Sequence, residues 1–103
     1  MAVAELFRAL GDPTRLEMVR RLSGGDSYTI SMLSSGLDVT RQGARKHLQT
    51  LVDAKIVTLQ PKGRDTVVFL DWEALERSKA FIVDLEQRWD TRLEALRLLV
   101  DGE

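Results

Sequence analysis

The sequence predicts a mainly α-helical domain with one β-hairpin, an α+β fold in which four helices precede two strands and a fifth helix. Apolar residues recur with helical spacing up to residue 54, and they alternate with other residues between 56 and 70. The spacing is helical again from residue 71 to about residue 100. Single glycines and prolines fall between these segments, as expected for short connections. We expect residues 1–103 to form a single domain, because the chain is long enough for one and no more.

The first two helices are predicted from their boundaries. Residues 3–10 place an apolar row on one side of a short helix, which ends at Gly11. Asp12 and Pro13 then begin a second helix, because Asp caps well and Pro at the first helical position loses no hydrogen bond. This helix extends to about Leu22.

The next two helices form a helix-turn-helix candidate. Thr29 is the N-cap of a short helix that ends near Gly36, and Thr40 is the N-cap of a helix that runs to about Ala54. Two helices joined by a few residues, with Gly in the joint, are typical of this motif.

A β-hairpin follows the motif. Ile56–Gln60 and Thr66–Leu70 are the predicted strands, and Pro61–Asp65 forms a flexible, basic tip between them. A helix-turn-helix followed by such a hairpin is a winged helix-turn-helix.

The last helix is too long to be covered by so small a domain. Asp71 caps it, and it runs to about Val100, which corresponds to roughly 45 Å. Its apolar side chains form a heptad-like stripe, which is best explained by a partner helix. The stripe comprises Leu75, Ile82, Leu85, Trp89, Leu96 and Leu99.

Charge is concentrated in one segment, although the net charge of the chain is only −1. Residues 40–64 contain six basic side chains and one acidic side chain, a net +5, whereas the remainder carries −6. A basic patch on an acidic body favours a polyanionic partner.

The outer face of the helix from Thr40 to about Ala54 carries long hydrogen-bond donors. An α-helix fits the DNA major groove, where Arg pairs with guanine and Gln with adenine. We therefore predict DNA binding, with base contacts from Arg41, Gln42, Arg45 and Gln49. Lys46, Lys62 and Arg64 are predicted to contact phosphates, and the cap residue Thr40 is placed to do the same.

Three segments of the sequence resemble the ArsR/SmtB family of winged-helix repressors, in particular its branch without metal-sensing cysteines. Residues 7–16 (FRALGDPTRL) are similar to the family's opening, and residues 40–48 (TRQGARKHL) to its recognition helix. Residues 51–57 (LVDAKIV) match the helix exit, except that Lys55 stands where Gly is usual.

This resemblance implies a homodimer formed by the first and last helices, which binds an inverted-repeat operator and blocks transcription. Leu6 and Phe7 would then join the stripe of the last helix at the dimer interface. Two alternatives stay open. The chain could be a protein–protein interaction module, or a repressor that responds to an organic ligand held by Trp72, Phe81 and Trp89.

Several other classes of function find no support. The chain has no cysteine, and no group of residues suits catalysis, so we expect neither an enzyme nor a metal or other cofactor. His47, the only histidine, is predicted to be a hydrogen-bonded structural residue. Asp90 and Glu94 lie one turn apart and could share an ion, but pairing with Arg97 and Arg88 suits them better. With no membrane span or secretory signal in the sequence, we expect a cytoplasmic protein.

Overall fold

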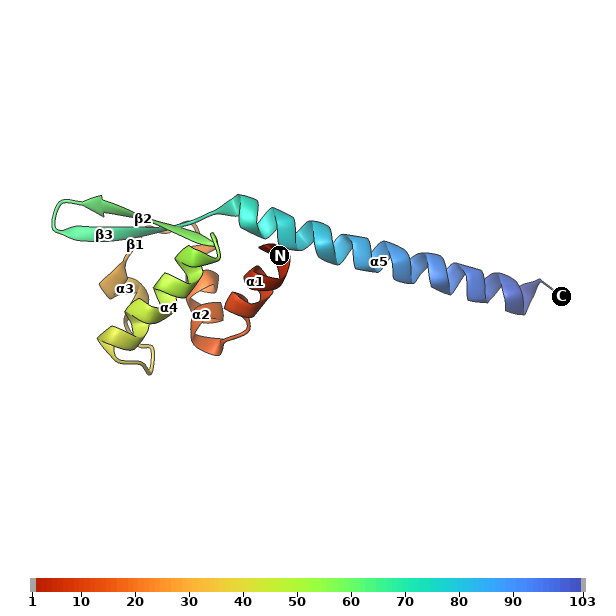
Figure 1. The fold of residues 1–103 in the computed structure, drawn as a ribbon, viewed down its shortest axis with the longest axis horizontal. Coiled ribbons are helices and arrows are strands. Elements are labelled where there is room, and N and C mark those ends of the chain that lie inside the picture. Colours follow the sequence, from red (N-terminus) through yellow and green to blue (C-terminus); the bar gives the residue numbers. More distant parts are fainter. Residues whose placement is uncertain (1, 103) are drawn as a thin grey trace.

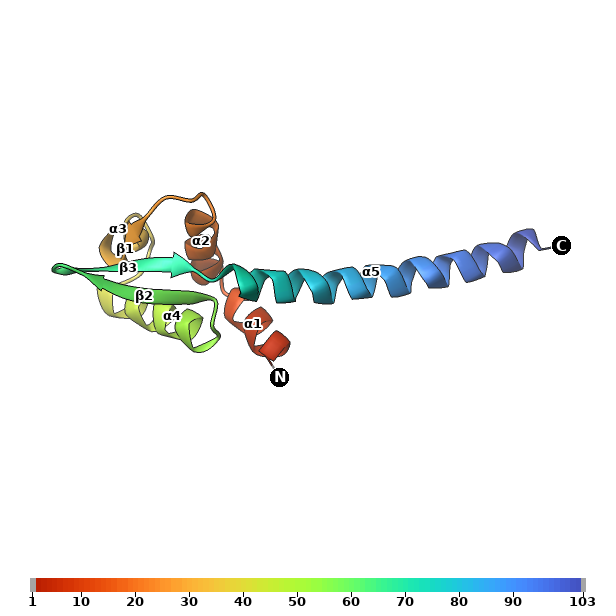
Figure 2. The ribbon, with the colours of Figure 1, turned by 90° about the horizontal axis from the view of Figure 1, so that it is seen from above.

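The structure, a computed structural model that describes residues 2–102, has a small winged body from which one long helix projects (Figures 1 and 2). Its principal extents are 71 × 26 × 25 Å. This is the mainly helical, winged helix-turn-helix arrangement that the sequence predicts. The elements in chain order are α1 (Ala2–Leu10), α2 (Pro13–Leu22), β1 (Tyr28–Thr29), α3 (Ile30–Ser34), α4 (Arg41–Asp53), β2 (Val57–Lys62), β3 (Asp65–Leu70) and α5 (Trp72–Asp101).

Each predicted N-cap is confirmed. The side chain of Asp12 accepts from the backbone N–H of Thr14 at 2.9 Å. The hydroxyls of Thr29 and Thr40 accept from the third residue beyond them, at 3.1 and 2.9 Å. The carboxylate of Asp71 accepts from the N–H of Glu73 at 3.0 Å. These bonds satisfy donors that a helix cannot pair internally, and they fix where the helices begin.

The cap of α2 makes folding stability depend on pH. Burial alone would raise the pKa of Asp12, but hydrogen bonds from the backbone of Arg15 and Thr14 outweigh it, and the pKa lies below its usual value of 3.8. The ionised cap therefore stabilises the fold above about pH 4, and this contribution is lost as the pH falls through the lowered pKa of the folded state. We expect Asp12→Ala to cost about 1 kcal/mol at pH 7.

Urea unfolding of wild type and Asp12→Ala at pH 7 and at pH 3 tests this dependence. The difference between the two proteins is expected to shrink at the lower pH. Asp26→Ala, which removes an exposed carboxylate that caps no helix, is the control. A difference that stays constant with pH would contradict the assignment.

The sheet contains a strand that the sequence did not predict. Within residues 2–102 the strand order is β1-β3-β2, and the two-residue strand β1 pairs with β3 through Tyr28↔Val68 and Thr29↔Val67. The tip of the hairpin also differs from the prediction. Strand β2 continues through Pro61 to Lys62, so the tip consists of Gly63 and Arg64 alone. Pro61 is tolerated there because β2 is an edge strand.

The core lies between the sheet and helices α1 to α4. Leu48 and Leu51 of α4 pack with Leu33 of α3, and all three are fully buried. Leu6 of α1 is 1% exposed and belongs to this same core. The prediction that Leu6 contacts a second copy is therefore wrong for this structure, because the inner row of α1 faces its own domain.

Helix α4 ends in a Schellman motif. The N–H of Lys55 donates to the carbonyl of Val52, and the N–H of Ile56 donates to the carbonyl of Leu51, both at 2.9 Å. Lys55 has a φ of +61° and is the only non-glycine residue with positive φ among residues 2–102. This is the position where the sequence departs from the family pattern.

Replacing Lys55 with glycine is expected to stabilise the protein by about 0.5–1 kcal/mol. Glycine removes the strain of the left-handed conformation, and the greater entropy of its unfolded chain offsets only part of that gain. Chemical denaturation measures the difference. Lys62→Gly, in an extended strand, is expected to destabilise instead. An unchanged or lower stability of Lys55→Gly would show that the left-handed conformation costs little here.

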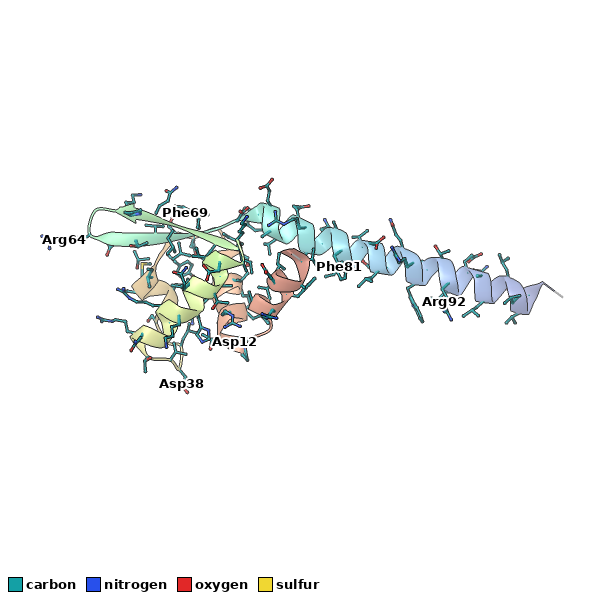
Figure 3. All side chains as sticks on the ribbon, viewed as in Figure 1. Asp12, Asp38, Arg64, Phe69, Phe81 and Arg92 are labelled. Carbon is teal, nitrogen blue, oxygen red and sulfur yellow. The ribbon has the colours of Figure 1, made fainter. Side chains whose placement is uncertain are left out.

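Helix α5 leaves the domain soon after it begins. Its N-terminal part packs on α1, where the rings of Phe7 and Phe81 lie 5.7 Å apart (Figure 3). From Lys79 to Gly102 every residue is exposed. The apolar stripe of α5 therefore has no partner within the part of the chain that the structure describes.

Candidate nucleic-acid interface

Helix α4 has a buried and an exposed face, as its sequence predicts. Ala44, Leu48 and Leu51 face the core and are at most 1% exposed. The predicted DNA contacts on this helix all lie on the surface: Arg41, Gln42, Arg45, Lys46 and Gln49. Apolar packing thus holds the inner face of the helix, while its long polar side chains are exposed on the outer face.

The structure brings three of the predicted arginines to one groove. Arg41 and Arg45 are four residues apart on α4, and Arg64 lies at the tip of the wing (Figure 3). Together with α3 they line an open groove of about 480 Å³. Three basic residues along an open groove favour an anion with several oxygen atoms, such as a phosphate backbone.

Residues with hydroxyl groups line the same groove, and the sequence analysis did not predict most of them as contacts. They are Thr29, Ser31, Ser34, Ser35, Thr40 and Thr66. Side-chain hydroxyls are common partners of phosphate oxygens in protein–DNA complexes. A cluster of serines in a short helix gives little signal alone, because only the fold places it opposite the arginines. One carboxylate, that of Asp65, also lines the groove.

The remaining predicted contacts lie outside the groove. Gln42, Lys46 and Gln49 form the neighbouring exposed row of α4, while Lys62 is exposed on strand β2. Gln49 donates from Nε2 to Oδ1 of Asp53 at 2.8 Å, so its amide is already oriented. The hydroxyl of Thr40 is engaged as the N-cap of α4.

His47 is partly buried and hydrogen-bonded, as the sequence predicts. Its Nδ1 lies 3.0 Å from Nη1 of Arg15. In residues 2–102 no group of three or more His, Asp or Glu side chains could hold a metal ion. On α5, Arg97 pairs with Glu94, as expected. Arg88 does not pair with Asp90. It pairs instead with Asp84, which lies one helical turn earlier and within reach of its side chain.

The apolar face of α5 is a second exposed surface. Leu75 is half-buried, whereas Ile82, Leu85, Trp89, Leu96 and Leu99 are between 46% and 75% exposed. Leu93, which the sequence interpretation left out, lies on the same side of the helix and is 44% exposed. Phe81 packs on Phe7, and Trp72 borders a separate shallow hollow beside Phe69, so these aromatics serve different surfaces.

In the described residues, 2–102, no helix is long and apolar enough to cross a membrane. Helix α5 has the length, but charged residues recur along it.

Comparison with known proteins agrees with this geometry. A family described as a helix-turn-helix domain matches residues 10–60, which run from the end of α1 into β2. An uncharacterized HTH-type transcriptional regulator, YuzN of Bacillus subtilis (strain 168), is 36% identical over 77 residues, covering 69% of this chain and 84% of the relative. The transcriptional repressor SdpR of the same strain is 25% identical over 88 residues, covering 85% of this chain and 97% of SdpR.

Solved structures resemble most of the chain. The ArsR-like transcriptional regulator from Rhodococcus sp. RHA1 superposes with a TM-score of 0.80 at 30% identity and covers 95% of this chain and 92% of its own. A structure described as a possible transcriptional regulator for arsenical resistance has a TM-score of 0.71 at 25% identity, covering 79% and 83% of the two chains. These relatives are regulators, not enzymes. The chain belongs to the ArsR family of helix-turn-helix transcriptional regulators, whose members bind DNA.

Proposed function

We propose that the protein is a homodimeric repressor that binds an inverted-repeat operator with helix α4. The observation that carries this proposal is the exposed row of donors on α4 beside a groove lined by three arginines. A helix supported by a core and flanked by a basic wing has the form that major-groove readers need.

The two parts of this surface suit different contacts. Arg41, Gln42, Arg45 and Gln49 are the proposed base contacts, because their side chains match the hydrogen-bonding edges of guanine and adenine. Lys46, Lys62 and Arg64 are the proposed phosphate contacts, and Thr40 stands beside them in the groove. The hydroxyls of α3 extend this phosphate-binding surface.

A second copy of the chain is the proposed partner of α5. Its long exposed apolar face would be unusual on a monomer in water, and an identical face on a second copy complements it by symmetry. Phe7, on α1, is half-buried against Phe81 of α5 and so lies at the edge of this surface. The proposed interface residues are Phe7, Leu75, Ile82, Leu85, Trp89, Leu96 and Leu99.

Repression, rather than activation, is supported by the similarity to SdpR, a transcriptional repressor. A dimer that binds a promoter hinders transcription by occupying the DNA. Repression of this kind needs no further protein partner. We also propose that it acts in the cytoplasm, where such DNA lies.

A gel-shift assay with the DNA upstream of the protein's own gene tests the proposal. We expect a discrete complex whose affinity falls steeply with salt, because phosphate contacts release counterions. Sequences selected from a random pool supply the operator if this DNA lacks it. Absence of salt-sensitive binding to either source of DNA would contradict the proposed function.

Arg45→Ala is expected to weaken binding to the operator by about 1–3 kcal/mol, because a bidentate contact to guanine is lost. Fluorescence anisotropy with operator DNA and with random DNA of equal length measures the change. Arg77→Ala, which removes an exposed arginine from α5, is the control and is expected to have little effect. Equal weakening on both DNAs would reassign Arg45 to a phosphate contact.

A further inference from the structure

One guanidinium group connects three helices behind the DNA-reading surface. Arg15 lies in the first turn of α2, and its Nε donates to the carbonyl oxygen of Ala9 in α1 at 2.6 Å. Its Nη1 lies 3.0 Å from Nδ1 of His47 in α4. Arg15 therefore joins the last turn of α1 to the middle of α4.

The contact between Arg15 and His47 has a fixed direction of donation. Arginine only donates hydrogen bonds and stays charged, so Nδ1 of His47 can bond to it only as an acceptor. Asp12, the N-cap of α2, places Oδ1 4.0 Å from the same ring nitrogen. The side chains of His47 and Asp12 are 23% and 26% exposed, so the junction is partly shielded from water.

The position of His47 couples the orientation of α4 to that of α2. It follows Arg45 and Lys46 directly in the sequence, but it lies on the inner side of α4, which faces α2. A rotation or tilt of α4 would break its bond to Arg15 and would move the exposed donor row at the same time. Helix α1, at the other end of the junction, packs on α5.

We propose that Arg15 is a positioning residue that sets the orientation of α4 relative to α1 and α5, and thereby the specific binding of DNA. This inference rests on the proposed function, because an inverted repeat needs two reading helices in a fixed mutual orientation. Phosphate contacts tolerate small changes in orientation better than base contacts do. Loss of the junction therefore weakens binding to the operator more than binding to random DNA.

Three variants test the geometry of the junction. Arg15→Lys keeps the charge, but a single ammonium nitrogen cannot make both contacts of the planar guanidinium group, to Ala9 and to His47. His47→Leu keeps much of the volume and removes the acceptor, whereas His47→Asn keeps an acceptor close to the position of Nδ1. Circular dichroism and thermal unfolding are measured for each variant alongside DNA binding.

We expect Arg15→Lys and His47→Leu to bind the operator about tenfold more weakly, the effect of losing about one hydrogen bond. Binding to random DNA is expected to change less than about twofold, since the contact residues are intact. His47→Asn is expected to stay within about twofold of wild type on both DNAs. If His47→Leu fails to fold, the difference in operator binding between Arg15→Lys and His47→Asn tests the role of the contact.

Wild-type affinity of Arg15→Lys for the operator, or an equal loss on both DNAs, would overturn the inference. Failure of the wild-type chain to bind any operator would instead overturn the proposed function. Amide hydrogen exchange without DNA separates the two cases. Arg15→Lys is expected to speed exchange in α4 but not in α3, because Arg21 holds α3 through the carbonyls of Leu33 and Ser35 at 2.9 and 2.7 Å. Unchanged exchange in α4 would count against Arg15 as a positioning residue.

Discussion

Replacing Trp89 and Leu96 together with glutamate is expected to yield a folded monomer that binds the operator about 10²-fold more weakly, or worse. Both side chains lie on the exposed apolar face of α5, far from the core of the winged domain. Charges on this face would have to be buried in the proposed dimer, which costs far more than leaving them in water. A monomer also contacts only one half-site of the operator. In a dimer, binding of the first half-site raises the effective concentration of the second reading helix at its own half-site, and the loss of this effect accounts for the drop in affinity.

Analytical ultracentrifugation and anisotropy measure the two effects. The matched control is Thr91→Glu with Leu98→Glu, which adds the same charges to the opposite side of α5. The control is expected to remain dimeric and to bind normally. A Trp89→Glu/Leu96→Glu protein that still has twice the protomer mass of 11.6 kDa would place the dimer interface elsewhere.

Leu51→Ala is expected to lower the free energy of unfolding by about 2–5 kcal/mol. Leu51 is fully buried on the inner face of α4 and is part of the core that the helices share with the sheet. Its truncation leaves a cavity that close packing cannot fill without moving α4. Since small domains have only about 5–15 kcal/mol of stability, this one change removes a large fraction of it.

Urea denaturation at fixed protein concentration measures the loss. Leu98→Ala makes the same chemical change at a site that is 63% exposed, away from the apolar stripe, and is expected to alter stability by less than about 0.5 kcal/mol. Equal effects at the two sites would show that Leu51 does not carry the packing assigned to it.

The parts of the fold that were predicted correctly depend on local chemistry. Asp12, Thr29, Thr40 and Asp71 each cap a helix through bonds that span two or three residues. Such contacts are fixed by neighbouring residues and can be inferred from sequence. The exposed donors of α4 were found for the same reason, because helical periodicity alone separates them from Ala44, Leu48 and Leu51.

The parts that were missed depend on contacts between distant segments. Strand β1 has two residues and exists only because β3 pairs with it from forty residues away. The continuation of β2 through Pro61 depends on its position at the sheet edge, which the order of segments does not reveal. Leu6 was misassigned because periodicity identifies an apolar face but not what covers it.

The candidate site shows the same division. Arg41, Arg45 and Arg64 were expected to meet DNA separately, yet the fold gathers them around one groove with the hydroxyls of α3. The contact between Arg15 and His47 joins residues 32 positions apart in the sequence, and no pattern in the sequence predicted it. The wheel position of His47 predicts an inward-facing, hydrogen-bonded ring but does not identify its partner.

In the proposed dimer, two chains joined through α5 present two α4 helices to one DNA duplex. Selection of binding sites from a random pool, followed by footprinting, tests this arrangement most directly. Such a dimer is expected to select an inverted repeat whose half-site centres lie about 10 base pairs apart, or a multiple of that, with one dimer bound per site. Enrichment of a single unrepeated half-site bound by one protomer would contradict it.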